Sequence, residues 1–362
     1  PFLLAGFMLP EDNCGTPSTQ ANQYDGPYVI YRNNQVFVKY VYDNGGVKTA
    51  RMDSIPLSQK ENTVLRVATD EPGKIFTVAL KKDLQNEKSE FSHTGKMLII
   101  SDIEGNFKAI RKLLQGNGVI DDNLQWTYGN GHLVLTGDFF DRGNQVTEVL
   151  WLIYSLEEKA KAAGGYVHFV LGNHEIMNMS GDIRYVNPKY FEASALMNED
   201  YMALFSEHTE LGRWLRTKNI VEKVGDILFA HGGISALLNS IDISATRINK
   251  LARPFYPDSS NKYNDAKVEL LYSDLGPFWY RGYYTGKNLA TQAQVDSTLR
   301  IYGVKYIATG HTVISDTVST LFNGKLFNTD VYHAKGFSEG LLVEDGKFYR
   351  VNAVGEKFQI GE

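Results

Sequence analysis

The sequence predicts a mixed α/β (α+β) protein with a small β-rich unit ahead of it. From Lys96 onward, short apolar stretches alternate with longer ones in which apolar residues recur about every 3.6 positions. This alternation is typical of α/β folds, in which helices cover the faces of a sheet. The apolar stretches end in glycine together with acidic, amide or histidine residues, and sites in open α/β sheets form at such strand ends.

The first part of the chain predicts an antiparallel β unit. Residues 28–82 hold several runs rich in Val, Ile and Tyr, separated by turn-forming pairs such as Asn33-Asn34 and Gly45-Gly46. Asparagine and glycine tolerate the positive φ angles that tight hairpin turns require. We therefore predict an N-terminal extension and a small β domain over residues 1–95.

The α/β part begins with the apolar run at 97–100. Further strands are expected at 132–137, 166–172, 226–233 and 306–311, each bounded by turn residues. Residues 106–116 and 145–165 have helical spacing and end in glycine, which favours helix termination. The second predicted domain spans 96–362.

Composition excludes several classes of protein. Of the 362 residues, 43% are hydrophobic and 22% charged, which is ordinary for a globular chain. The net charge of -5 gives no general attraction for nucleic acid, and no stretch approaches the ~20 apolar residues of a membrane span. The single Cys14 excludes an intrachain disulfide. The apolar stretch Pro1–Pro10 is compatible with a signal-sequence remnant or with an arm packed on the core, so periplasmic export and a cytoplasmic location both stay open.

Five polar clusters follow predicted strands and together predict a metal site. Carboxylate, amide and imidazole groups without sulfur suit a hard to borderline divalent ion such as Mn²⁺, Mg²⁺, Fe²⁺ or Zn²⁺. Adjacent glycines let the loops turn sharply and approach the ions closely. One such cluster alone is more often a turn, but five in order at strand ends indicate a site. The clusters are Asp102-Ile103-Glu104-Gly105-Asn106, Gly137-Asp138-Phe139-Phe140-Asp141-Arg142-Gly143, Gly172-Asn173-His174-Glu175, His231-Gly232-Gly233 and Gly310-His311.

These motifs resemble those of the calcineurin-like metallophosphoesterase superfamily. GDFFDRG and GNHE are similar to its phosphoprotein-phosphatase branch, and LGNHEIMNMSGDIRYV with GPFWYRGYYTG is similar to the Shewanella-like phosphatase group. The resemblance covers roughly residues 96–352 and identifies the second predicted domain as a metallophosphoesterase domain. It implies a two-sheet β-sandwich flanked by helices, with a centre for two divalent ions.

The resemblance also implies which residues hold those ions. Asp102 would bind the first ion, Asp138 would bridge the two, and Asn173, His231 and His311 would bind the second. Two such ions would activate a water molecule and clamp the phosphate. We expect Mn²⁺ first, with Mg²⁺, Fe²⁺ or Zn²⁺ as alternatives.

Four further residues would carry out the chemistry around the ions. Arg142 and Arg281 would hold the phosphate oxygens, because a guanidinium matches phosphate geometry with two parallel hydrogen bonds. His174 would protonate the leaving oxygen, and Asp141 would orient His174.

Glu104 departs from the family pattern, which usually has histidine as a ligand of the first ion at this position. Three interpretations stay open. Glu104 is a direct oxygen ligand, an acid that reaches a water on the first ion, or a sign that the first ion is lost and activity is low. An added carboxylate favours Mn²⁺ or Mg²⁺ over Fe²⁺ or Zn²⁺.

The predicted function is metal-dependent hydrolysis of phosphomonoesters, with a phosphorylated protein as substrate and a lean toward phosphotyrosine. Arg184, Tyr185 and Tyr280 lie in motif-bearing loops and are candidates for shaping the substrate pocket. Two alternatives remain: hydrolysis of small or nucleotide phosphoesters on the same centre, and a weakly active relative that binds phosphorylated ligands. The retained residues Arg142, His174 and Arg281 argue against the second alternative.

Overall fold

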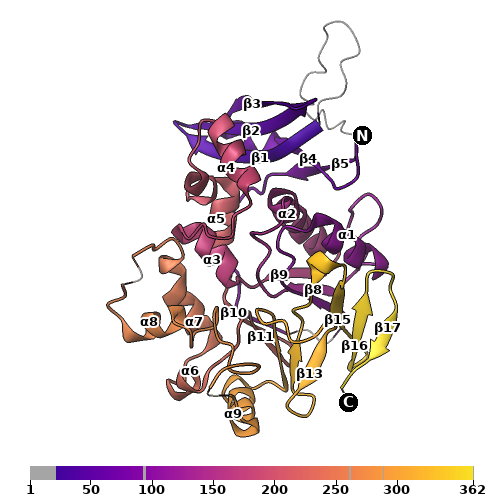
Figure 1. Cartoon of the computed structure of the whole chain (residues 1–362), viewed down its shortest axis with the longest axis vertical. Coiled ribbons are helices and arrows are strands. Elements are labelled where there is room, and N and C mark those ends of the chain that lie inside the picture. The colour runs from indigo at the N-terminus through magenta and orange to yellow at the C-terminus, as the bar shows by residue number, and fades with distance from the viewer. Residues whose placement is uncertain (1–21, 93–94, 261, 288, 362) are drawn as a thin grey trace, which may run out of the picture.

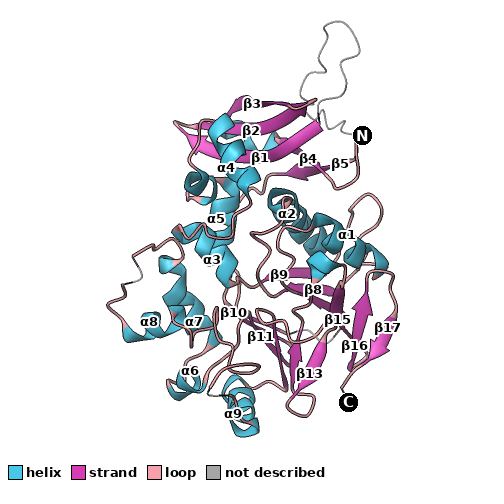
Figure 2. Ribbon diagram, in the orientation of Figure 1, coloured by secondary structure: helices cyan, strands magenta, loops and turns pink. Residues whose placement is uncertain are grey.

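The computed structural model describes residues 22–92, 95–260, 262–287 and 289–361. The prediction for Pro1–Pro10 lies outside these residues. Two six-stranded sheets form the centre of the molecule, helices surround them, and smaller sheets lie at one end (Figures 1 and 2). Within the described residues, no helix combines the length and apolar character that crossing a membrane requires.

The first sheet carries the first three predicted clusters. Its parallel strands β7 (Met97–Ile100), β8 (His132–Leu135) and β9 (Tyr166–Phe169) are joined by α1 (Phe107–Gly116) and α2 (Val146–Ala162). The capping Asn106 side chain accepts from the backbone amide of Ala109, so α1 begins directly after the first cluster. The antiparallel strands β15 (Glu339–Glu344), β16 (Lys347–Asn352) and β17 (Lys357–Gln359) extend the sheet beside β7.

The second sheet carries the two histidine clusters. Strands β11 (Ile227–Ala230), β12 (Tyr306–Thr309) and β14 (Leu326–Asn328) run parallel. The other members are β13 (Ser319–Leu321), β10 (Val221–Val224) and β6 (Glu90–Phe91). Ile99 and Val134 of the first sheet pack with Phe229 and Phe327 of the second in one buried cluster. The predicted two-sheet architecture is therefore confirmed.

Seven more α-helices complete the described part of the chain. Their bounds are α3 (Asn173–Ser180), α4 (Pro188–Leu196), α5 (Glu210–Arg216), α6 (Ala236–Ser240), α7 (Ala245–Ala252), α8 (Ala266–Tyr272) and α9 (Gln292–Tyr302).

The N-terminal β unit packs directly on the larger part. Strands β1 (Asn22–Arg32), β2 (Gln35–Asn44) and β3 (Val47–Pro56) form an antiparallel sheet, and β4 (Val64–Ala68) pairs with β5 (Ile75–Ala79). The Trp151 indole of α2 donates to the Pro27 carbonyl at 2.8 Å, and Tyr28 belongs to the same buried core as Trp151. The division at residue 95 stays a prediction, and β6 precedes it while pairing with β10.

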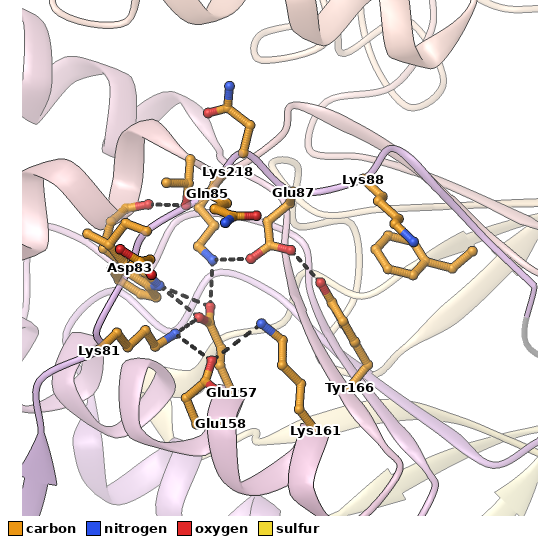
Figure 3. Close-up of a pocket in the computed structure, with 15 residues that line it drawn as sticks. Lys81, Asp83, Gln85, Glu87, Lys88, Glu157, Glu158, Lys161, Tyr166 and Lys218 are labelled. Carbon is orange, nitrogen blue, oxygen red and sulfur yellow. Dashed lines mark hydrogen bonds and ion pairs between the residues drawn. The ribbon is translucent and has the colours of Figure 1, made fainter.

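A buried ion network fixes the chain that follows β5 (Figure 3). Glu157 of α2 accepts from Lys218 at 2.7 Å, from the Trp214 indole at 3.0 Å and from Lys81. Lys218 also contacts Glu87 at 3.1 Å. Burial raises the pKa of Glu157, but Lys218 and then Lys81 outweigh it and hold that pKa at about 2. Residues 81–87 are thus held to α2 by buried charge.

We expect Glu157→Gln to lower the free energy of unfolding by about 3 kcal/mol, because it leaves Lys81 and Lys218 buried without their shared anion. Since the pKa of Glu157 is depressed from 4.5 to about 2, the native advantage is complete above pH 4.5 and lost as the pH falls toward 2. Urea unfolding of the starting protein and the variant at several pH values measures this difference in the free energy of unfolding. Glu269→Gln, at an exposed position of α8 outside the network, is the control. Equal stability of both variants would contradict the role of the network.

Candidate metal centre and active site

The five predicted clusters meet where β7, β8, β9, β11 and β12 end. Four of them border a cavity of about 350 Å³, and the buried His231 cluster lies behind its wall, against Asp138 and Asn173. Members of the clusters form part of this wall, and Arg281 and residues from the loops that follow β12 and β14 form the rest. The wall includes Asp102, Glu104, Asp138, Arg142, Asn173, His174, Arg281, His311, Asp330, Tyr332 and His333.

The backbone at this site is held in uncommon conformations. Positive φ angles occur at Asp102 (52°), Glu104 (49°), Asp138 (61°), Asp141 (68°), Arg142 (55°) and His311 (70°). Such residues persist only where the surroundings determine them, and they cluster at functional sites. A Cβ atom on Gly172 would lie 2.3 Å from Asp138 Oδ1, and one on Gly310 would lie 2.3 Å from Asp102 Oδ2. Glycine is therefore required for the loops to approach these carboxylates.

Oxygen and nitrogen donors converge on Asp138. Its Oδ2 lies 3.0 Å from His231 Nε2, which lies 3.0 Å from the Asn173 side-chain oxygen. His231 Nδ1 donates to the Thr136 carbonyl at 2.7 Å, so Nε2 faces the other donors. Ligand atoms of Asp138, His231 and His311 all lie within 4.8 Å of one another. This donor set fits a divalent ion.

The pKa values of Asp138 and His231 also favour a bound cation at this site. Burial raises the pKa of Asp138, but the His231 and His174 imidazoles outweigh it, and the net pKa is lowered. Burial lowers the pKa of His231, but Asp138 outweighs it and raises that pKa to about 10. The raised pKa keeps a proton on His231, and this proton balances the charge of Asp138. A bound cation would take the place of that proton.

Asp102 and Glu104 leave the first sheet beside this group and have different partners. Asp102 accepts from the His311 backbone amide at 3.1 Å. The Glu104 carboxylate pairs with the Arg142 guanidinium in the cavity wall, where the Glu104 side chain is 18% exposed and that of Arg142 52%. Glu104 therefore anchors an arginine of the cavity wall.

His174 and Asp141 form an oriented pair. His174 Nδ1 lies 2.6 Å from Asp141 Oδ2, and Asp141 Oδ1 accepts from the Asn178 amide at 2.9 Å. His174 Nε2 lies 3.7 Å from Asp138 Oδ2. Burial lowers the pKa of His174, but Asp138 and Asp141 outweigh it, so the net pKa lies above its usual value. A protonated imidazole beside the donor set is suited to act as an acid.

The predicted pocket residues take different places. Arg281 borders the cavity and donates to the His311 carbonyl at 2.6 Å. Tyr185 lies beside the His174 ring, with centroids 5.2 Å apart, and is partly exposed. Arg184 is exposed and pairs with Asp182. Tyr280 differs from the prediction: it is buried, its hydroxyl accepts from the Gln294 amide, and it is absent from the described cavity wall.

Two supporting residues were missed by the sequence analysis. The buried Glu175 carboxylate accepts from the backbone amides of Asp138, Phe139 and Gly172 and so holds two clusters together. Its position directly after His174, at the end of GNHE, is the sequence signal for this role. Asn178 follows His174 by one helical turn, and this spacing predicts a shared helix face.

Two packed sheets with a carboxylate and imidazole centre at their strand ends define a metallophosphoesterase. The chain belongs to the calcineurin-like phosphoesterase family, whose sequence profile matches residues 95–315. Members of this family use divalent metal ions, and the chain is a metal-dependent phosphatase. The predicted family, fold and enzyme class are confirmed.

Particular relatives extend the comparison beyond the family profile. Shewanella-like protein phosphatase 2 of Arabidopsis thaliana is 27% identical over 307 residues, covering 71% of this chain and 76% of the relative. Shewanella-like protein phosphatase 1 of Plasmodium berghei is 27% identical, with 77% and 80% coverage. The structure of a cold-active protein tyrosine phosphatase at 1.1 Å is 35% identical, with a TM-score of 0.84 and 94% and 98% coverage. The cold-active enzyme of a psychrophilic Shewanella species gives a TM-score of 0.83 at 35% identity, with 92% and 98% coverage.

Proposed function

We propose that this chain is a two-metal protein phosphatase that prefers phosphotyrosine. The observation that carries the proposal is the cavity that Asp138 and His311, two members of the Asp138–His231–His311 group, share with Arg142, Arg281 and His174. Similarity to Shewanella-like protein phosphatases and to cold-active protein tyrosine phosphatases supports a protein substrate. The exposed rings of Tyr185 and Tyr332 beside the cavity suit an aryl group.

Asp102, Asp138, Asn173, His231 and His311 would hold two divalent ions, with Mn²⁺ as our first choice because oxygen donors are numerous. When bound, such ions make water a nucleophile at neutral pH and offset the charge of the phosphate.

The protein's own groups would position the ester and handle its proton. Arg142 and Arg281 would bind non-bridging oxygens, and a phosphate would compete with Glu104 for Arg142. Water would attack phosphorus opposite the ester oxygen, so that one P–O bond forms as the other breaks. His174 Nε2 would give its proton to the departing oxygen, while Asp141 holds Nδ1–H in place.

We expect Arg281→Ala to lower kcat/KM roughly thirtyfold, which corresponds to a loss of about 2 kcal/mol of transition-state stabilisation. The same change should weaken inhibition by inorganic phosphate. The reason is the loss of a charged donor from the cavity wall. Inhibition constants for phosphate measure the effect, with the exposed Arg300→Ala as control. Unchanged phosphate inhibition would place Arg281 outside the phosphate site.

A panel of phosphotyrosine, phosphoserine and phosphothreonine peptides and nucleotides, assayed with Mn²⁺, tests the substrate proposal. The highest kcat/KM is expected on phosphotyrosine. Faster hydrolysis of nucleotides than of every peptide would instead support a small-molecule phosphoesterase on the same centre.

A further inference from the structure

Asp330 places another carboxylate in the cavity wall. The residue is 5% exposed and lies two positions after β14. Its backbone amide donates to Asn328 Oδ1 at 2.9 Å, but within the described residues its carboxylate makes no hydrogen bond or ion pair with the protein. Asp330 belongs to none of the five sequence clusters, so the motifs gave it no role.

The fold delivers this carboxylate to the same edge as the predicted ligands. β14 runs parallel to β12, with Asn328 paired to Thr309, so Asp330 leaves the sheet beside His311. The Thr329 hydroxyl lies 3.0 Å from Ser101 Oγ and 3.3 Å from Thr136 Oγ1. The residue before Asp330 is thus tied to the ends of both β7 and β8.

The charged neighbours of Asp330 belong to the site already described. Asp102, Asp138 and Arg281 line the same cavity wall as Asp330, and burial, followed by the charge of Asp102, raises the pKa of Asp330. The Arg281 guanidinium donates to the His311 carbonyl and to Thr312 Oγ1, so it is not committed to Asp330. A buried carboxyl beside two further acids needs a proton or a cation as its partner.

We propose that Asp330 is a further metal ligand, which binds the first ion together with Asp102 and Asp138. It would supply the donor that Glu104 does not supply while Glu104 is paired with Arg142. This inference rests on the proposed two-ion centre. It makes the first position an all-oxygen site, which favours Mn²⁺ or Mg²⁺ over Zn²⁺.

Manganese binding by the full chain tests the inference without reference to turnover. Chelator-treated protein is titrated with Mn²⁺, and free Mn²⁺ is followed by electron paramagnetic resonance. The starting protein should bind two ions. Asp330→Asn should weaken one of them at least tenfold and leave the other within threefold. Glu104→Gln should keep both within threefold, as should the control Asp345→Asn in the exposed β15–β16 turn.

Each departure from this pattern has a distinct meaning. Two unchanged affinities in Asp330→Asn would overturn the inference and leave the proposed function standing, whereas failure of the starting protein to bind two ions would reject both. Weakening in Glu104→Gln alone would assign the extra ligand to Glu104. Melting temperatures separate binding from folding: ion-free Asp330→Asn should melt at or above the starting protein, and added Mn²⁺ should raise its melting temperature less. A lower ion-free melting temperature would mean that Asp330 has a structural role instead.

Discussion

Asp138→Asn should lower kcat by at least about a thousandfold, which corresponds to a rise in the activation free energy on the order of 4 kcal/mol. It should also reduce the amount of manganese bound per chain. Asparagine keeps the size of the side chain but removes the anion that would be shared by two cations. The same charge also stabilises His231, because Asp138 Oδ2 lies 3.0 Å from His231 Nε2. Steady-state kinetics and elemental analysis of the same preparation measure both effects.

Asp226→Asn is the matched control for this change. Asp226 is exposed and pairs with Lys305 at 2.8 Å, so losing its charge should leave both metal content and kcat near their starting values. An Asp138→Asn protein that kept its ions and its rate would refute the assignment of Asp138 as the bridging ligand.

His174→Asn should slow hydrolysis of phosphoserine peptides by about a hundredfold to ten-thousandfold, and that of p-nitrophenyl phosphate much less. The serine alkoxide is a poor leaving group and needs the proton, whereas nitrophenolate departs with little help. His174 has the placement for this work, with Nδ1 held by Asp141 and Nε2 toward Asp138. The ratio of the two kcat/KM losses is the decisive quantity.

The exposed His208 provides the control for that variant, and His208→Asn should change neither rate. Equal losses on the two substrates in His174→Asn would mean that His174 positions the substrate or the ions and does not donate the proton.

The strands could be predicted from the sequence, and so could the meeting of the five clusters at one site, because both follow from short-range patterns. The run at 97–100 is β7, and the clusters around Asp138, His231 and His311 follow β8, β11 and β12 as expected. Strands that run parallel bring their carboxyl ends to one edge, so residues far apart in sequence could be predicted to meet. The roles given to those residues remain predictions, although the structure gathers them at one cavity.

The remaining features depend on contacts that no local pattern encodes. The pairing of Glu104 with Arg142 joins two loops, and the exposure of Asp330 to the cavity depends on how β14 packs against β7 and β8. The stretch 81–92 is rich in polar and charged residues, yet Lys81 is held by Glu157 and β6 lies within that segment. Polar composition predicts exposure on average, and only the folded chain shows which charges find buried partners.

The central claim is that metal ions held at the Asp138 cavity support phosphate-ester hydrolysis, and one titration tests it directly. Protein stripped with a chelator is assayed on a phosphotyrosine peptide while Mn²⁺ is added and bound Mn²⁺ is counted. We predict no turnover without metal and a rate that rises to its maximum as two ions bind per chain. Full turnover by the stripped protein, or two bound ions without turnover on any phosphomonoester, would contradict the account.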